Sequence, residues 1–137
     1  MKRIVNALTF DHAISLLPSD FLPFHEIGGR KKLLDTPKGI IAFRHSSLLD
    51  CGEWKTSYNE EAIRKEIDYL IYALGYDGIL LLSREVLLSF EHQNYKSRWA
   101  NNGYPIHVYK ENGRYYWHGM KGNSKDLTDC FITASKK

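Results

Sequence analysis

The chain has 137 residues, of which 43% are hydrophobic and 13% aromatic, enough for one core without disulfide bonds or a structural metal. This composition argues against disorder across most of the chain. Its 19 basic and 16 acidic residues leave a formal charge of +3, which permits a nucleic-acid partner or an acidic protein partner without demanding either. We expect one domain that spans residues 1–137.

The sequence predicts a soluble, cytoplasmic protein with no membrane partner. No stretch approaches the roughly 20 apolar residues of a membrane span, and Asn6, Thr9 and Asp11 interrupt the N-terminal segment before a secretory apolar region forms. Cys51 and Cys130 lie far apart and lack Cys-x-x-Cys spacing. We therefore expect reduced thiols rather than a disulfide framework or a cysteine-rich zinc site.

Short elements are predicted in the first third of the chain. Residues 2–8 favour a strand, and Asp11–Leu17 favours one or two helical turns that Pro18 ends. A loop rich in proline and glycine follows. Gly39–Phe43 then predicts a strand, introduced by Pro37, whose aliphatic run indicates burial on both faces.

The strongest local pattern predicts a helix from about Asn59 to Leu74. Ser57 and Glu60 have the Ser-x-x-Glu spacing of a capping box, and Gly75 suits a left-handed cap at the other end. An apolar stripe recurs at helical spacing and consists of Ile63, Ile67, Leu70, Ile71 and Leu74. Such a stripe must pack on an apolar surface, and the sheet that follows is the obvious candidate.

Two β-hairpins are predicted after this helix. Ile79–Leu82 and Val86–Phe90 have the composition of strands joined at Ser83–Glu85. Asn112-Gly113 is the favoured pair for a two-residue type I′ turn because both positions need positive φ, and 127–133 adds a last strand or turn. The predicted fold is α+β, with one main helix packed on a mostly antiparallel sheet that contains two β-hairpins.

A two-residue turn at Asn112-Gly113 fixes which residues face each other. The predicted facing pairs are Glu111 with Arg114, Tyr109 with Tyr116, Val108 with Trp117, and His107 with His118. One face then belongs to the core and consists of Ile106, Val108, Tyr115 and Trp117. The other carries His107, Tyr109, Tyr116 and His118, which could stack bases, contact a peptide or, through the histidines, share a metal. Tyrosine is also a good strand residue, so a purely structural role stays open.

The stretch Leu74–Gln93 has a carboxylate near each end. A helix bearing Glu, then Asp entering a strand, then Glu-x-Lys on the next strand, is similar to the core of the PD-(D/E)XK nuclease superfamily over about residues 60–103. The resemblance implies Mg²⁺ held by Asp77 and Glu91, with support from Glu66, and an attacking water oriented by the third polar group. Gln93 stands where the family usually has lysine, and Lys96 lies nearby. These five residues are the candidate catalytic and metal-binding set.

The nuclease hypothesis depends on the turn of the first hairpin. A three-residue turn at Ser83–Glu85 would pair Asp77 with Glu91 on one face. A two-residue turn would pair Asp77 with Phe90 and send Glu91 to the opposite face. The turn lacks Gly, Asn and Asp, so both registers stay open. The alternative is structural, because Tyr-Asp-Gly is common turn chemistry at the start of a strand.

A second resemblance concerns the same residues. "ALGYDGI" resembles a stretch of some small ADP-ribosyltransferases, in which a helix leads through Gly-Tyr-Asp-Gly into a strand, and His118-Gly119-Met120 resembles their His-Gly-Thr element. Separately, one loop before the predicted helix collects reactive residue types, which loop composition explains equally well: His45, Ser46, Ser47, Asp50, Cys51 and Glu53.

These patterns predict a protein that works on or beside DNA or RNA, in its most specific form a divergent Mg²⁺-dependent nuclease. The basic run Arg30, Lys31 and Lys32 could contact phosphates. The alternative is a non-catalytic binding or inhibitor protein of the phage anti-defence or toxin-immunity kind, which uses the Tyr/His face and the basic loop on a protein partner. An ADP-ribosyltransferase-like domain ranks third, and a homodimer is compatible with all three.

Overall fold

The computed structural model describes residues 6–27, 33–90 and 103–134, which form two β-sheets and three short helices. The six strands of sheet A are, in spatial order, β1 (His25–Ile27), β2 (Leu33–Thr36), β3 (Gly39–Ser46), β5 (Tyr69–Leu74), β6 (Gly78–Ser83) and β10 (Phe131–Thr133). The four strands of sheet B are β4 (Glu53–Asn59), β7 (Gly103–Glu111), β8 (Arg114–His118) and β9 (Ser124–Asp126). The helices are α1 (Phe10–Ile14), α2 (Glu60–Lys65) and α3 (Arg84–Ser89), and short 3₁₀ turns are η1 (Ser19–Phe21), η3 (Met120–Gly122) and η4 (Thr128–Cys130).

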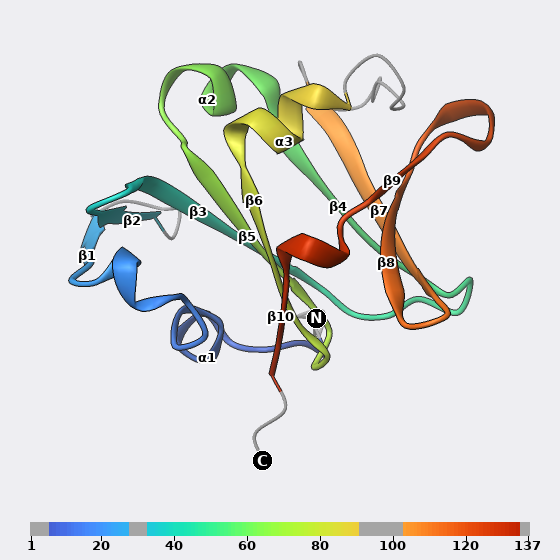
Figure 1. The fold of residues 1–137 in the computed structure, drawn as a ribbon, viewed down its shortest axis with the longest axis horizontal. Helices are drawn as coiled ribbons and strands as arrows, with labels where there is room; N and C mark the ends of the chain where they lie inside the picture. The colour runs from blue at the N-terminus through green and yellow to red at the C-terminus, as the bar shows by residue number, and fades with distance from the viewer. Residues whose placement is uncertain (1–5, 28–32, 91–102, 135–137) are drawn as a thin grey trace, which may run out of the picture.

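The two sheets enclose one core, and a second core lies on the far side of sheet A. In Figure 1, sheet A occupies the left and centre and sheet B the right, with α2 and α3 at one end. Neighbouring strands are antiparallel except β3 and β5, which are parallel. The core between the sheets includes Tyr72, Leu80, Trp117, Ile63 of α2 and Leu87 of α3.

The predicted fold class is wrong, because the described chain is mostly β-sheet and has no main helix. The predicted helix 59–74 is α2, six residues long, followed by strand β5. The cap is also different: the Asn59 side chain accepts a hydrogen bond from the N–H of Ala62 at 2.9 Å, while Ser57 lies within β4. Asp68, which directly precedes β5, fixes this segment beside β3, because its carboxylate accepts a hydrogen bond from the Ile40 N–H at 2.8 Å.

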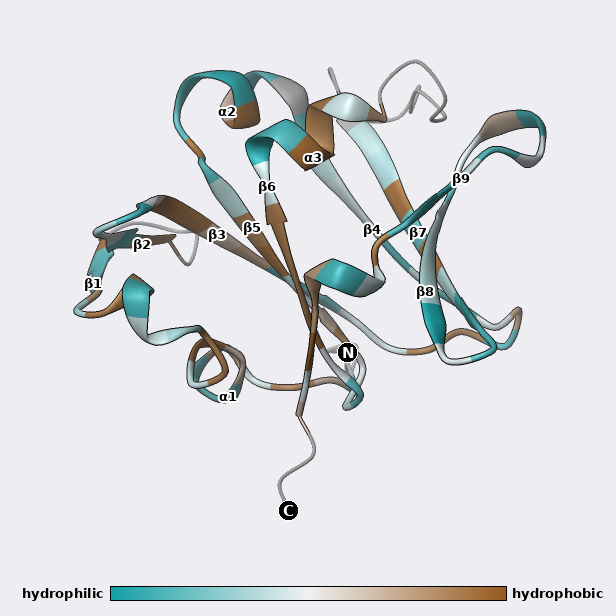
Figure 2. Cartoon of the chain, viewed as in Figure 1, coloured by the Kyte–Doolittle hydropathy of each residue, from teal (hydrophilic) through white to brown (hydrophobic). Residues whose placement is uncertain are grey.

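Burial on both faces explains why β5 imitates a helix in the sequence. Leu70, Tyr72 and Leu74 belong to the core between the sheets, whereas Ile71 and Ala73 belong to the core formed with α1 and its neighbours. When both faces of a strand are buried, successive residues are all apolar, and some of them fall at helical spacing by chance. Figure 2 shows the resulting hydrophobic track along β5 and β6.

The predicted hairpin 79–90 is also wrong in its second half. Ile79–Leu82 lies in β6 as expected, but Val86–Phe90 belongs to α3 and its C-terminal cap. The hydroxyl of Ser83 accepts a hydrogen bond from the Val86 N–H at 3.2 Å and caps this helix. The partner of β6 is β5, reached through the turn at residues 75–77, where Gly75 has φ of 54°.

Several other predictions are confirmed. The expected strand at Gly39–Phe43 is the first part of β3, and the Asn112-Gly113 turn joins β7 to β8 with positive φ at both residues, 53° and 78°. All four predicted facing pairs occur. The predicted core face is buried, with Ile106, Val108 and Trp117 each at 0% exposure.

The predictions for the N-terminal elements are confirmed only in part. The first helix is shorter than predicted and ends at Ile14, and the predicted strand 2–8 lies partly outside the described residues, with residues 6–8 not in a strand. Cys51 and Cys130 are free. Among the helices described, none has both the length and the apolar character that a membrane crossing requires.

Candidate functional site

Asp77 lies in the exposed turn between β5 and β6, where its neighbours neutralise it. Its Oδ2 accepts a hydrogen bond from the Tyr115 hydroxyl at 3.2 Å and lies 3.7 Å from Lys110 Nζ. Burial, and then the charge and hydrogen bond of Asp77, raise the pKa of Tyr115 to about 12. A hollow of about 450 Å³ beside them is lined by Tyr76, Asp77, Lys110, Gly113, Tyr115, Thr128, Phe131 and Thr133. Asp77 is therefore partnered by a cation and a phenol.

The structure keeps two of the predicted acids, Glu66 and Asp77, apart. Glu66 follows α2 and precedes β5, whereas Asp77 follows β5, so roughly 20 Å of strand separates them. One cation cannot join carboxylates that far apart. Glu91, Gln93 and Lys96 lie outside the described residues, and the element after β6 is α3 rather than a strand. Across residues 6–27, 33–90 and 103–134, no group of three or more His, Cys, Asp or Glu side chains is placed to hold a metal ion.

Two further predictions concern the basic run and the ADP-ribosyltransferase resemblance. Arg30, Lys31 and Lys32 lie outside the described residues. Gly75–Gly78 joins two antiparallel strands, so the passage from a helix into a strand that the ADP-ribosyltransferase resemblance implies does not occur.

The four predicted Tyr and His residues do share the outer face of sheet B, which we call the tyrosine face: Glu53, Lys55, His107, Tyr109, Glu111, Arg114, Tyr116, His118 and Asp126. The rings of Tyr109 and Tyr116 are stacked, with centroids 5.3 Å apart and planes at 25°. His118 packs edge-on against Tyr109 at 6.0 Å. These tyrosines are half-buried and stand on the two central strands of sheet B.

Glu53 of β4 organises the histidine side of this face. Its Oε2 lies 2.8 Å from His118 Nδ1, and its Oε1 lies 3.9 Å from Lys55 Nζ. The Glu53 side chain is only 16% exposed, which keeps this pairing partly shielded from solvent. Burial, followed by the nearby charge of Lys55, lowers the pKa of His107. Sequence reasoning placed Glu53 in a loop and missed its role, because the contact needs the long-range pairing of β4 with β7.

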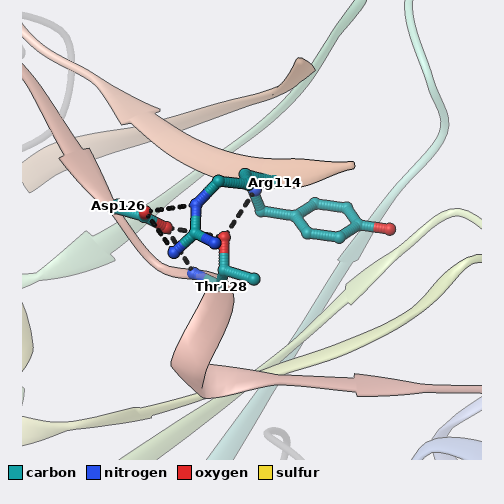
Figure 3. Close-up of polar contacts among 4 residues, drawn as sticks. Arg114, Asp126 and Thr128 are labelled. Atoms are coloured by element: carbon teal, nitrogen blue, oxygen red, sulfur yellow. Dashed lines mark hydrogen bonds and ion pairs between the residues drawn. The ribbon is translucent and has the colours of Figure 1, made fainter. Parts of the chain in front are cut away.

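A clamp of Arg114, Asp126 and Thr128 fixes the edge of the face (Figure 3). Arg114 Nε and Nη2 each lie 2.7 Å from Asp126 Oδ2. Asp126 Oδ1 accepts from the Thr128 N–H at 2.9 Å and the Thr128 hydroxyl at 2.6 Å, and Thr128 Oγ1 accepts from the Tyr115 N–H at 3.0 Å. The Thr128 hydrogen bonds, with help from Arg114, lower the pKa of Asp126 to about 2.

We expect Asp126→Asn to remove the part of the acid sensitivity of folding that comes from this carboxylate. Since the folded pKa is about 2 and an unfolded aspartate titrates near 3.9, the carboxylate stabilises the fold above about pH 4 and loses this contribution as the pH falls toward 2. The difference in urea midpoint between wild type and variant should therefore shrink from pH 4 to pH 2. Asp129→Asn, which removes a neighbouring exposed carboxylate, is the matched control. A difference that stays constant over this range would contradict the expectation.

Comparison with protein-family models, with curated proteins and with solved structures finds no match to this chain.

Proposed function

We propose that this chain is a non-catalytic binding protein of the inhibitor type, whose protein partner contacts the tyrosine face. The observation that carries the proposal is the stacked pair Tyr109 and Tyr116, half-exposed on the two central strands of sheet B. Tyrosine is enriched at protein interfaces and among the residues that dominate binding energy, because it offers a large apolar ring and a polar tip.

The support beneath the pair favours binding with little loss of entropy. Val108 and Trp117 are chain neighbours of the two tyrosines, point to the opposite side of the sheet and are fully buried. Each tyrosine is therefore carried by a strand whose other face is core. A rigid platform of this kind loses few conformations when a partner docks.

The charges of the tyrosine face favour a polypeptide over nucleic acid. Alternation and register place three carboxylates on it, Glu53, Glu111 and Asp126, against two cations, Lys55 and Arg114. Both cations lie within 4.0 Å of one of these carboxylates. Contact with a phosphate backbone needs cations that can displace counterions, whereas mixed, paired charges are usual at the rim of protein interfaces. Nucleic-acid binding elsewhere on the chain, through Arg30 to Lys32, stays a prediction.

Photo-crosslinking tests the proposal and identifies the partner in one experiment. A benzophenone amino acid is introduced at Lys55, on the tyrosine face, and separately at Tyr76, an exposed control on the turn between β5 and β6. In cells of the source organism, we expect one protein to be captured from position 55 and not from position 76. Mass spectrometry identifies it, and the purified pair is then measured by calorimetry.

The affinity of the purified pair decides the outcome. Tyr109→Ala and Tyr116→Ala should each weaken binding roughly 10- to 100-fold, the range expected of central aromatic contacts, while Tyr76→Ala should leave it unchanged. Equal affinity for Tyr116→Ala and wild type would contradict the proposal. So would an oligonucleotide that binds with strong salt dependence and is lost in Tyr116→Ala, because the face would then serve nucleic acid.

A further inference from the structure

We infer that a hollow between α1 and β3 binds a small aromatic amine, which is an aromatic ring that carries a protonated amino group. The hollow has a volume of about 630 Å³, which is in the range of small-molecule sites. Phe10 of α1 and Phe43 pack in the core on the side of sheet A away from sheet B, so this ligand is independent of the protein partner proposed above. The lining residues are Thr9, Phe10, Asp11, Phe43, Arg44 and His45.

The end of β2 helps to explain why the hollow exists. Within the described residues, β2 pairs with β3 only from Gly39 to Ala42. The following residues of β3, from Phe43 onward, keep β5 as their strand neighbour on the other side. The start of α1 lies beside this part of β3, since the rings of Phe10 and Phe43 meet edge to face with centroids 5.4 Å apart.

Strand alternation decides which side chains of β3 face the hollow, because successive side chains of a strand point to opposite sides of the sheet. Phe43 packs against the core that contains Phe10, so Phe43 and His45 face α1. Arg44 points the other way, toward sheet B, where its Nε donates to the Ser57 carbonyl at 3.3 Å. Among the lining residues, no lysine or arginine side chain therefore faces the hollow.

The rings in the hollow determine the apolar part of the ligand. The His45 ring packs against that of Phe43 with centroids 5.2 Å apart and planes at 53°. His45 is exposed and Phe43 is half-buried, so a ligand can reach both rings. A flat aromatic ring packs well against such side chains by offset stacking or edge-on contact. We therefore expect the ligand to be aromatic.

Asp11 determines the charge of the ligand. It is exposed, and none of the ion pairs among the described residues includes it. The Thr9 hydroxyl, which lies beside it, accepts a hydrogen bond from the His12 N–H at 3.1 Å and is committed to the start of α1. A carboxylate without a cation can accept a charge-assisted hydrogen bond from an ammonium group. An amino group on the aromatic ligand therefore fits this side of the hollow.

The overall charge of the chain makes a preference for amines informative. The chain carries a formal charge of +3, so its long-range field attracts anions and repels cations. A site that prefers an amine to a neutral or anionic analogue must owe this preference to a nearby carboxylate. Asp11 is the only acidic residue that lines the hollow.

Titration by amide NMR tests the inference with three probes of similar shape: phenethylamine, phenethyl alcohol and hydrocinnamate. At about pH 8 an alkylamine keeps its proton, whereas a free imidazole has lost its own. We expect phenethylamine to bind with a dissociation constant on the order of 1 mM and to shift the amide signals of Phe43 and His45. Phenethyl alcohol should bind about three- to fivefold more weakly, and hydrocinnamate more weakly still. No saturable shift with phenethylamine, or equal affinity for either analogue, would overturn the inference.

Variants at two exposed positions separate the charge from the ring contacts. Asp11→Asn should weaken phenethylamine binding to the level of phenethyl alcohol and leave the alcohol unchanged, whereas His45→Ala should weaken both about twofold. Asp129→Asn is the control, because it removes an exposed carboxylate from η4, next to the edge strand β10 on the other side of β5 and β6. It should leave all affinities unchanged. The inference fails if Asp11→Asn keeps the preference for the amine, or if His45→Ala changes neither affinity.

Discussion

Gly78→Ala should destabilise the fold by about 3 kcal/mol, the upper part of the usual range for overpacking. A Cβ at this position would overlap the backbone carbonyl of Ile132 and stand 2.8 Å from Cζ of Phe131. Both belong to β10, which pairs with β6 directly at this point, Thr133 opposite Gly78. Backbone atoms of a paired strand cannot rotate away as a flexible side chain can, so β10 must shift or separate.

Urea unfolding followed by circular dichroism measures this cost. Gly52→Ala is the matched control, because Gly52 has φ of 87° and no atom lies within 4 Å of the place where its Cβ would stand. Gly52→Ala should lower the free energy of unfolding by only about 1 kcal/mol, the cost of alanine in a left-handed backbone conformation. Equal losses for the two variants would mean that β10 does not approach Gly78 as closely as described.

Trp117→Ala should destabilise the fold by about 3–5 kcal/mol, as expected for the loss of a buried tryptophan. Trp117 has 0% exposure, its ring centroid lies 4.8 Å from that of Phe90, and its Nε1 donates to the Pro105 carbonyl at 3.2 Å. Removing the indole leaves a cavity between the two sheets and an acceptor without this donor.

Tyr116→Ala is the control for this prediction. The residue precedes Trp117 on the same strand but faces the other side of the sheet, so its loss should cost less than about 1 kcal/mol. Thermal denaturation of both variants compares them. A large loss of stability in Tyr116→Ala would contradict the assignment of its ring to an accessible surface. The variant would then no longer report on partner binding alone.

Sequence reasoning succeeded where a local signal decides the geometry. The Asn112-Gly113 turn requires positive φ at both positions, so it fixed the register of β7 and β8 and the composition of both faces. The tyrosine pair follows from that register alone. Glu53 could not be predicted in the same way, because β4 pairs with a strand about fifty residues further along the chain.

The failures share a physical cause. β5 is apolar on both faces because a core lies on each side of sheet A, and a sequence without alternation cannot distinguish a buried strand from a helix. In α3, Ser83 caps the helix and Leu87 anchors it to the core, although its branched and aliphatic residues favour a strand. The nuclease resemblance required a strand there, and the observed helix removes that support.

The chain leaves sheet A after β3, places β4 in sheet B, and then returns through α2 to continue sheet A with β5 and β6, while β10 joins this sheet last. β4 therefore pairs with β7 only after Gly103 and its successors have been synthesised. Until then the ribosome-bound chain must hold Trp54 and Tyr58, both buried in the finished protein, without the strand that covers them. Late closure of such non-local pairing slows folding and prolongs the exposure of apolar surface, so the order of these strands leaves half of the inter-sheet core uncovered until the second half of the chain has been made.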